Sequence, residues 1–305
     1  MKIRGELLLF ITATIWGLSF VVQKLGMEYI GPFTFSAVRL ILGGLVLIPV
    51  IMFFEKRQKE QFSLKGTKLL QAGMLLGVFI AGGVLLQQVG IQYTTAGKSA
   101  FITALYIVFV PALGFLFKKK TGILTWVSVV IAVIGLYLLS IKGDFTMSRG
   151  DLLTVLCSFF WGAHIVLIGR FAKHANGLKL SCIQFLTAGV IALILAFIFE
   201  EIQINNLLLS YQALLFSSVV VVGIAYTLQI FGQKSVDDSV AAIILSLESV
   251  TAVFAGMIFL GETMSLREGI GALLMFIAIL ISQRKPRTEE AIVAESIEEA
   301  DEYLQ

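Results

Sequence analysis

Ten long apolar stretches, separated by short polar segments, dominate this chain. They cover residues 6–26, 33–54, 67–90, 94–117, 122–141, 150–172, 177–199, 209–231, 237–260 and 266–283. These lengths match the roughly 17–25 residues that a helix needs to cross the hydrocarbon core of a bilayer. The apolar runs are continuous rather than alternating, which excludes a transmembrane barrel. The pattern therefore predicts an all-α membrane protein with ten transmembrane helices.

The composition agrees with this pattern and narrows the class of protein. Of the 305 residues, 58% are hydrophobic and only 14% are charged. A soluble chain cannot bury that much apolar surface, so an ordinary cytosolic enzyme, a nucleic-acid binder and a disordered regulator are excluded. The longest connection, about 55–67, is too short for a soluble nucleotide-binding domain, so ATP-driven transport is not expected.

Basic residues predict the orientation of the spans. With the N-terminus in the cytoplasm, the inner segments carry 17 Lys and Arg residues and the outer segments carry five. The positive-inside rule then places both termini in the cytoplasm of a plasma or inner membrane. The first span resembles a signal peptide but is too long and lacks a small-residue cleavage site, so we expect it to stay uncleaved. The lysines of 56–68 and 118–120 are expected to contact anionic lipids, and residues 284–305 to form an acidic cytoplasmic tail.

The two halves of the chain resemble each other. Residues 5–140 align with 150–282, first at an offset of 145, which places Trp16 on Trp161, and from the third span onward at 142, which places Gln87 on Gln229. Each half carries five spans, an odd number, so the second half must lie inverted relative to the first. Inverted repeats are typical of secondary transporters. Two five-helix repeats are therefore the expected domains.

Several local patterns resemble the EamA-type branch of the drug/metabolite transporter superfamily. They are the Trp-Gly of the first span, the run Thr103–Pro111 followed by Lys118–Lys120, and the Leu-Gly-Glu of 260–262. The resemblance covers about 5–283 and implies a ten-helix carrier of small metabolites, often amino acids or related compounds, that frequently works outward. Many relatives have Glu-Pro in the ninth span where this chain has Glu248 and Ser249. This chain therefore lacks the proline that is expected to kink the ninth span in those relatives.

Glu248 is the clearest candidate for substrate binding. An ionisable side chain inside a span costs about 2.5–3.5 kcal/mol on insertion scales, so each one is a functional candidate. Glu248 lies at the middle of the ninth span and aligns with Tyr106 of the fourth. It is expected to carry a proton or to bind a substrate ammonium, with the Tyr106 phenol facing it. The alternative is a carboxyl that only hydrogen-bonds neighbouring helices.

Aromatic residues supply a second set of candidates. Trp16 and Trp161 lie at the middle of their spans, although tryptophan usually prefers the membrane interface. They are expected either to form cavity walls and cation–π surfaces for a substrate or simply to pack between helices. His164 lies one turn from Trp161 on the same face. It is read as a substrate or proton site, or as a buried histidine with a protein partner.

Polar residues in the spans complete the candidate binding set. Gln87 and Gln229 form a mirror pair whose amides need partners in each other, in a backbone or in a substrate, and Thr103 lies one turn before Tyr106. Arg39 is expected to extend outward along the lipid interface; the alternative is that it faces the pore and meets a carboxylate. Lys98 allows the same two interpretations, and Pro111 is expected to kink the fourth span.

The cysteines, the histidines and the lack of catalytic motifs argue against disulfide, metal and enzyme chemistry. Cys157 and Cys182 lie in apolar stretches and are expected to be packing residues. Two histidines and the lack of catalytic motifs predict no enzyme activity, metal or cofactor. We expect a small-molecule substrate, a lipid surround, no nucleic acid, and a monomer or homodimer. The alternative function is a membrane sensor, assembly subunit or membrane-embedded enzyme without transport.

Overall fold

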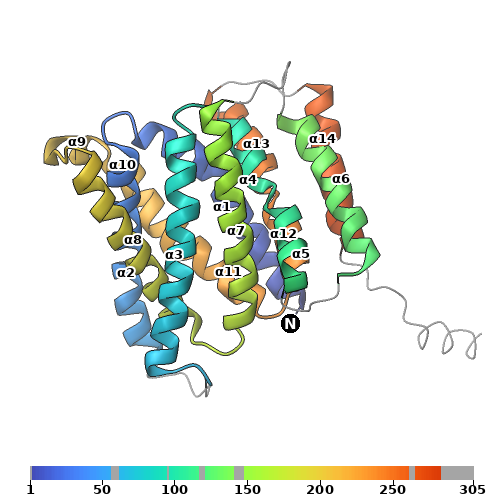
Figure 1. Cartoon of the computed structure of the whole chain (residues 1–305). Coiled ribbons are helices and arrows are strands. Elements are labelled where there is room, and N and C mark those ends of the chain that lie inside the picture. Colours follow the sequence, from blue (N-terminus) through green and yellow to red (C-terminus); the bar gives the residue numbers. More distant parts are fainter. Residues whose placement is uncertain are drawn as a thin grey trace, which may run out of the picture.

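The protein is described by a computed structural model over residues 2–55, 62–94, 96–116, 121–140, 148–260 and 265–282. These residues form helices, with no strand among them (Figure 1). The expectations for Lys118–Lys120, for Glu262 and for the tail 284–305 fall outside these ranges, as does the side chain of Lys98.

The helices of the first half precede residue 141 and those of the second half follow residue 147. The first group is α1 (Lys2–Gly26), α2 (Pro32–Glu55), α3 (Gly66–Gly90), α4 (Ala96–Ala104), α5 (Tyr106–Leu116) and α6 (Ile123–Ser140). The second is α7 (Arg149–Phe171), α8 (Gly177–Phe199), α9 (Ile204–Leu209), α10 (Tyr211–Leu215), the π-helix η1 (Phe216–Ala225), α11 (Tyr226–Gln233), α12 (Asp238–Leu245), α13 (Glu248–Leu260) and α14 (Leu266–Ser282).

Eight helical stretches of the described chain are long and apolar enough to cross a membrane. They start at Arg4, Pro32, Gly66, Ser99, Arg149, Gly177, Tyr211 and Asp238. The expected fifth span corresponds to the shorter apolar stretch Ile123–Leu138, and the expected tenth to the 17-residue α14. Large apolar side chains such as Leu45, Phe197 and Ile258 are exposed on the outside of the bundle, as lipid contact requires. The chain is therefore a multi-pass membrane protein.

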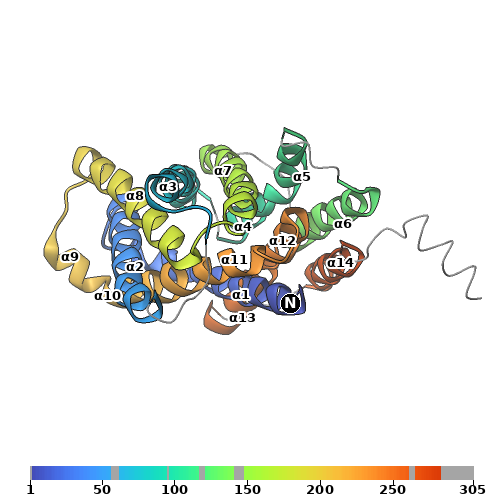
Figure 2. The ribbon, with the colours of Figure 1, turned by 90° about the horizontal axis from the view of Figure 1, so that it is seen from below.

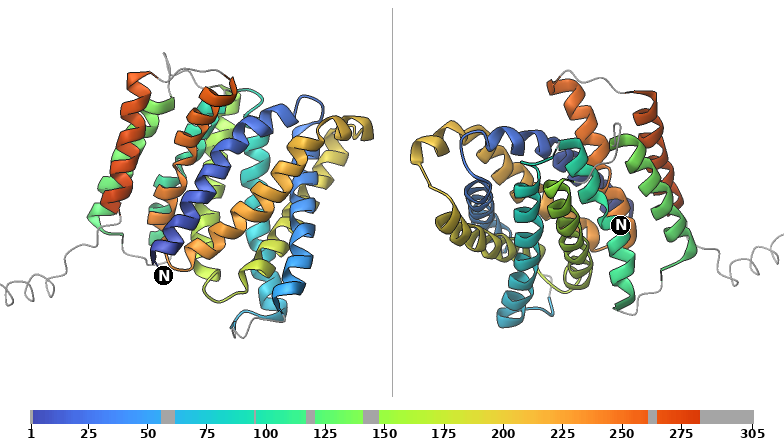
Figure 3. Two further views of the ribbon diagram at one scale, coloured as in Figure 1. Left: turned by 180° about the vertical axis from the view of Figure 1, so that it is seen from behind. Right: turned by 45° about the horizontal axis from the view of Figure 1, so that its top comes forward.

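The helices form an elongated bundle with α1, α3, α7 and α11 near its middle (Figures 1 and 2). The pair α6 and α14 lies at one edge, and α2 and α8 pack together towards the other, as the view from behind also shows (Figure 3). The central helices carry the buried core, which includes Trp16, Trp161 and Tyr226. Cys157 and Cys182 are both free and buried, as expected for packing residues.

The fourth and ninth spans are each broken into two half-helices. In the fourth span α4 ends at Ala104 and α5 begins at Tyr106; in the ninth α12 ends at Leu245 and α13 begins at Glu248. α5 continues through Pro111, where a kink was expected, and the interruption of the fourth span lies at Leu105. The ninth span is interrupted without a proline, because the chain tightens into i→i+3 hydrogen bonds from Leu247 to Ile244 and from Ser249 to Ser246.

Glycine pairs bring backbones together at the two ends of the bundle. A Cβ atom on Gly150 of α7 would lie 2.5 Å from the Gly90 carbonyl oxygen at the end of α3. Likewise, a Cβ atom on Gly232 of α11 would lie 3.0 Å from the Gly5 carbonyl oxygen near the start of α1. α1 begins at the end of the bundle where the N-terminus is marked, and α7 begins at the opposite end (Figure 1). The two halves thus pack backbone against backbone at each end of the bundle.

Candidate functional site

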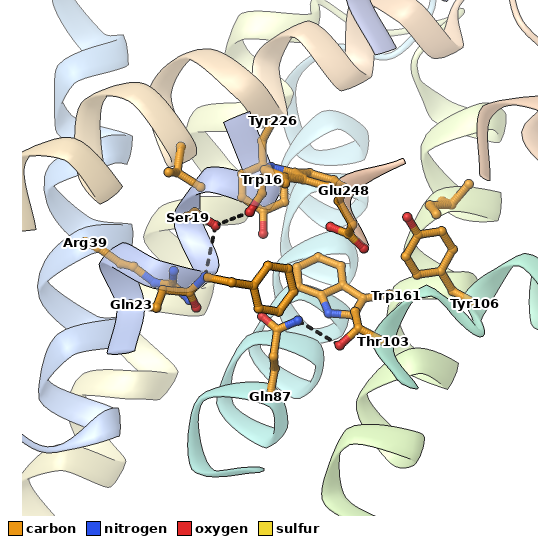
Figure 4. A pocket seen from close by; sticks show the side chains of 13 residues that line it. Trp16, Ser19, Gln23, Arg39, Gln87, Thr103, Tyr106, Trp161, Tyr226 and Glu248 are labelled. Carbon is orange, nitrogen blue, oxygen red and sulfur yellow. Dashed lines mark hydrogen bonds between the residues drawn. The ribbon is translucent and has the colours of Figure 1, made fainter. Parts of the chain in front are cut away.

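A pocket lies inside the bundle where both halves of the chain meet (Figure 4). The space between its lining atoms amounts to about 440 Å³, including parts open to solvent. Its lining consists of Trp16, Ser19, Phe20, Gln23, Arg39, Gln87, Thr103, Tyr106, Trp161, Ile165, Val221, Tyr226 and Glu248. None of these residues exposes more than 7% of its surface. The pocket is therefore lined by buried residues inside the bundle.

The broken helices place two facing polar groups in the pocket. Tyr106 is the first residue of α5 and Glu248 is the first residue of α13. A half-helix begins there without preceding helical turns, so its first side chain projects into the pocket rather than along a continuous helix surface. Tyr106 and Glu248 lie close enough to interact electrostatically. Apart from this interaction, neither the Tyr106 hydroxyl nor Glu248 Oε1 has a hydrogen-bond partner within the described chain.

Three aromatic rings form a wall of the pocket. The ring centroids of Trp16 and Tyr226 are 4.8 Å apart, those of Trp16 and Trp161 are 6.1 Å apart, and Trp161 stacks on Tyr226 at 5.9 Å with 22° between the planes. The indole N–H groups of Trp16 and Trp161 are buried without a partner in the described residues. Unsatisfied donors beside an aromatic face suit a ligand that brings both a hydrogen-bond acceptor and a cation.

Arg39 carries a positive charge to another part of the pocket. Its side chain is buried, so the expected outward extension is wrong: Arg39 Nη2 donates to Gln88 Oε1 at 3.2 Å, and the guanidinium lies 5.4 Å from the centre of the Phe35 ring. These contacts hold it inside the bundle. Arg39 Nε has no partner, and no carboxylate of the described chain lies within salt-bridge distance of Arg39.

The mirror pair of glutamines is not brought together at the pocket. Gln87 lines it and donates to the Thr103 hydroxyl at 3.0 Å, so both of these candidates lie at the site. Gln229 does not line it, because its amide donates to Gln233 at 3.1 Å along its own helix. Tyr226, one turn earlier on the same helix, lines the pocket instead.

His164 also lies away from the pocket. It is fully buried, its Nε2 lies 3.1 Å from Gln184 Oε1, and its ring meets Trp161 edge to face at 5.9 Å. This geometry fits the interpretation of a buried histidine with a protein partner. Its link to the pocket is indirect, through the Trp161 ring.

Sequence reasoning missed three polar lining residues, namely Ser19, Gln23 and Tyr226. Ser19 and Gln23 follow Trp16 by three and seven residues, so the three share one helix face. They form a chain in which Gln23 donates to Ser19 at 3.0 Å and Ser19 donates to the Trp16 carbonyl at 2.7 Å. This polar stripe on an apolar helix was the signal that could have revealed them. The sequence signal for Tyr226 was weaker, because it is only a single phenol within an apolar run.

The pocket offers hydrogen-bonding and charged groups but no evident metal site. No cluster of three or more His, Cys, Asp or Glu residues suited to a metal ion occurs in the described part of the chain. The arrangement is that of a binding site: an acid, a cation, two amides and a wall of aromatic rings around a space inside the bundle.

Comparison with known proteins agrees with this picture. A curated protein of Archaeoglobus fulgidus described as an uncharacterized transporter is 29% identical over 92% of this chain and 86% of its own length. The uncharacterized inner membrane transporter YedA of Escherichia coli is 26% identical over 91% of this chain and 90% of its own length. The uncharacterized transporter YoaV of Bacillus subtilis is 25% identical over 88% and 92%, respectively.

A crystal structure of another protein shares the fold. Its TM-score is 0.76 at 15% sequence identity, and the match covers 93% of this chain and 97% of that one. The model of the EamA-like transporter family matches the chain twice, over residues 3–141 and 148–283. Since these two matches span nearly all of it, this membrane protein belongs to the EamA-like transporter family.

Proposed function

We propose that this protein is a secondary transporter that moves small metabolites, amino acids or related compounds, outward across the membrane. The observation that carries the proposal is the pocket inside the bundle, because both halves line it and several of its buried polar groups lack protein partners. Unsatisfied polar groups in a membrane interior are costly, so their persistence indicates a ligand that completes them.

Transport is proposed to occur by alternating access between two inverted five-helix repeats, 5–140 and 150–282. Support comes from the helix breaks, because Leu105 and Leu247 are separated by 142 residues, the offset that relates the later spans of the two halves. Discontinuous helices at corresponding positions of two repeats are typical of transporter binding sites. The close glycine contacts, Gly150 with Gly90 and Gly232 with Gly5, lie at opposite ends of the bundle. Each is proposed as the contact that closes the pocket towards one side of the membrane.

The same proposal fixes the topology. Both termini face the cytoplasm, and the acidic tail 284–305 lies there, because the basic residues are concentrated on that side. A single cysteine placed in the connection 56–61 of a cysteine-free variant tests this orientation. Labelling of that cysteine by an impermeant reagent from outside intact cells would overturn it.

The function is tested by metabolite flux. Cells producing the wild-type protein are compared with cells producing Glu248→Gln at equal abundance in the membrane, by untargeted analysis of the medium. We expect one or a few small metabolites to accumulate outside wild-type cells only, and purified protein in liposomes to move the same compounds. Glu201→Gln is the matched control, since it neutralises an exposed carboxyl outside the pocket lining. Wild-type protein that changes no metabolite in cells and carries none in liposomes would overturn the proposal.

A further inference from the structure

Two apolar side chains line the pocket at equivalent positions of the two halves, Phe20 of α1 and Ile165 of α7. Phe20 follows Trp16 by four residues, and Ile165 follows Trp161 by four residues. Each therefore lies about one helical turn, roughly 6 Å, beyond its tryptophan. The offset of 145 that places Trp16 on Trp161 also places Phe20 on Ile165. The two halves thus supply one apolar side chain each at the same distance from the aromatic wall.

These two side chains lie on opposite sides of the tryptophan pair. α1 begins at the end of the bundle where the N-terminus is marked, and α7 begins at the opposite end (Figure 1). Phe20 is therefore displaced from the rings towards the end where α7 begins, and Ile165 towards the end where α1 begins. Under the proposed topology these are the outer and the cytoplasmic ends, respectively. Both side chains are packed by protein, since Phe20 is 2% exposed and Ile165 is 1% exposed.

Phe20 packs in a small apolar cluster on the outer side of the pocket. Its buried partners are Ile91, directly after α3, Ala100 of α4 and Ala252 of α13, and Met27, directly after α1, packs against them. Two of these partners are alanines, and a methionine side chain adapts easily to its surroundings. Phe20 is therefore the largest side chain of a thin layer, and a change of its rotamer meets little bulky, rigid packing.

Ile165 is held more firmly than Phe20. It belongs to the main apolar core, and its carbonyl oxygen accepts from Gln233 Nε2 of α11 at 2.9 Å. A β-branched side chain has little rotamer freedom in a helix, so Ile165 moves mainly with α7 itself. Towards the cytoplasmic end a second cluster packs α3, α7, α8 and α11 together. In the described chain its buried members are Leu69, Ala72, Leu76, Leu167, Ile168, Ala172, Ala175, Leu180 and Ile230.

We infer that Phe20 and Ile165 are the side chains that close the pocket towards its two sides, Phe20 towards the outside and Ile165 towards the cytoplasm. A carrier with alternating access opens its site to one side at a time, so each side needs a closing group of its own. Phe20 opens the outer side when its ring turns within the thin cluster, whereas Ile165 opens the inner side only when α7 moves. This inference rests on the proposed transport function and topology, and it adds two residues that control access rather than binding.

The test is the labelling of a pocket thiol from each side of the membrane. Val221 lines the pocket from η1, so Val221→Cys places a thiol there. Replacing Cys157 and Cys182 by serine leaves that thiol as the only one in the full-length chain. An impermeant thiol reagent is applied to intact cells for the outer side and to inverted membrane vesicles for the cytoplasmic side. The two rates measured in this parent are the reference for each variant.

Each closing residue should affect one side only. Phe20→Ala should speed labelling from outside about tenfold or more without speeding it from the cytoplasm, because losing a large buried side chain shifts the closed–open equilibrium towards the open form. Ile165→Ala should speed labelling only from the cytoplasmic side, and by a smaller factor, since the inner cluster stays packed. The matched controls Phe101→Ala and Ile243→Ala remove the same side chains from core positions that do not line the pocket. They should favour neither side.

A second pair of variants applies if an alanine variant does not fold. Phe20→Leu keeps an apolar side chain but lacks the ring, so it should still speed labelling from outside. Ile165→Phe gives the inner position the larger side chain of its counterpart, so it should slow labelling from the cytoplasmic side. Neither variant should change the rate on the other side in the same direction.

The outcomes separate this inference from the proposed function, because labelling requires no substrate. If Phe20→Ala speeds labelling equally from both sides, or changes it no more than Phe101→Ala does, the role of Phe20 as the outer closing group is overturned while transport stands. The same comparison of Ile165→Ala with Ile243→Ala decides the inner position. If the rates are side-specific but the wild-type protein carries no metabolite in liposomes, the proposed function fails and the two closing residues remain.

Discussion

Tyr106 and Glu248 lie next to one another at the pocket, at the first positions of two half-helices that are 142 residues apart in the chain (Figure 4). The same offset relates their spans in sequence, so a phenol in one half occupies the place that a carboxyl occupies in the other. The pocket is thus built from equivalent positions with different chemistry. The two sides of the pocket therefore differ chemically although the two halves are similar. A substitution at Tyr106 can test the role of the pocket without removing an ionisable group.

The first prediction concerns Tyr106→Phe. Apart from its interaction with Glu248, the hydroxyl has no partner in the described chain, so its removal should lower the free energy of unfolding in detergent by no more than about 1 kcal/mol, the net contribution of one hydrogen bond. Transport should nevertheless fall about 2- to 10-fold, the worth of one neutral hydrogen bond to a substrate. Thr103→Val is the contrast, because it removes the acceptor of Gln87 and should lower stability as well. Unchanged flux in Tyr106→Phe would exclude its hydroxyl from the binding site.

The hydropathy pattern predicted the apolar helices well, because membrane insertion depends on summed transfer energies over about 20 residues. It could not predict the interruption before Glu248, which depends on local i→i+3 hydrogen bonds rather than on composition, or the π-helical turns from Phe216 to Ala225. It also favoured an outward extension of Arg39, because this residue lies near the outer end of its span. Only tertiary contacts reveal that Gln88 and Phe35 retain that side chain inside.

Symmetry in the sequence was informative for some residues and misleading for others. Trp16 and Trp161 both line the pocket, but of the glutamine pair only Gln87 does. The reason is a local difference: Gln233 lies one turn from Gln229 and accepts its amide, whereas the first half has Ile91, which has no acceptor in its side chain, at the corresponding place. Equivalent positions share a backbone location, and their neighbours decide where the side chains point.

The second prediction treats His164 and Gln184 as a structural pair. His164→Leu should lower the free energy of unfolding by about 1–3 kcal/mol, because it leaves the buried Gln184 carbonyl oxygen without its partner. Adding Gln184→Leu should restore most of that loss, since replacing both partners by apolar groups of similar size is nearly neutral. Chemical denaturation of the two single variants and the double variant measures the coupling. Substrate affinity should be the same in all three, and a selective loss of affinity in folded His164→Leu would instead make this histidine part of the binding site.

The third prediction concerns Glu200, which joins the end of α8 to the start of α2. Its carboxylate accepts from the backbone N–H groups of Phe33 and Thr34, each at 2.7 Å, and from the Thr34 hydroxyl at 2.6 Å. It therefore acts as the N-terminal cap of α2, supplied from the other half of the chain. Glu200→Ala should lower stability by about 1–2 kcal/mol, the usual cost of losing a cap. Glu200→Gln retains one acceptor oxygen and should lose less stability than Glu200→Ala. Equal losses of stability in the two variants would show that the stabilisation comes from the charge of the carboxylate.

The last prediction uses the two glycine contacts at opposite ends of the bundle. In Gly150→Ala the added methyl would meet the Gly90 carbonyl, and in Gly232→Ala it would meet the Gly5 carbonyl and the Leu9 side chain. Backbone atoms cannot move aside as a flexible side chain can, so the helices must separate at that end. Under alternating access, each substitution should open the pocket towards its own side and disfavour opening on the other.

Accessibility of a pocket cysteine measures this shift. Val221→Cys lines the pocket, and in a background without Cys157 and Cys182 it is the only thiol. Relative to that parent, Gly150→Ala should speed its labelling from the outer side and Gly232→Ala from the cytoplasmic side, each by an impermeant reagent. Gly269→Ala is the matched control, because a Cβ atom there meets nothing within 4 Å. If both variants change the labelling rate equally and from the same side, closure at two separate ends is contradicted. A general loosening of the bundle would have the same effect whichever end was altered.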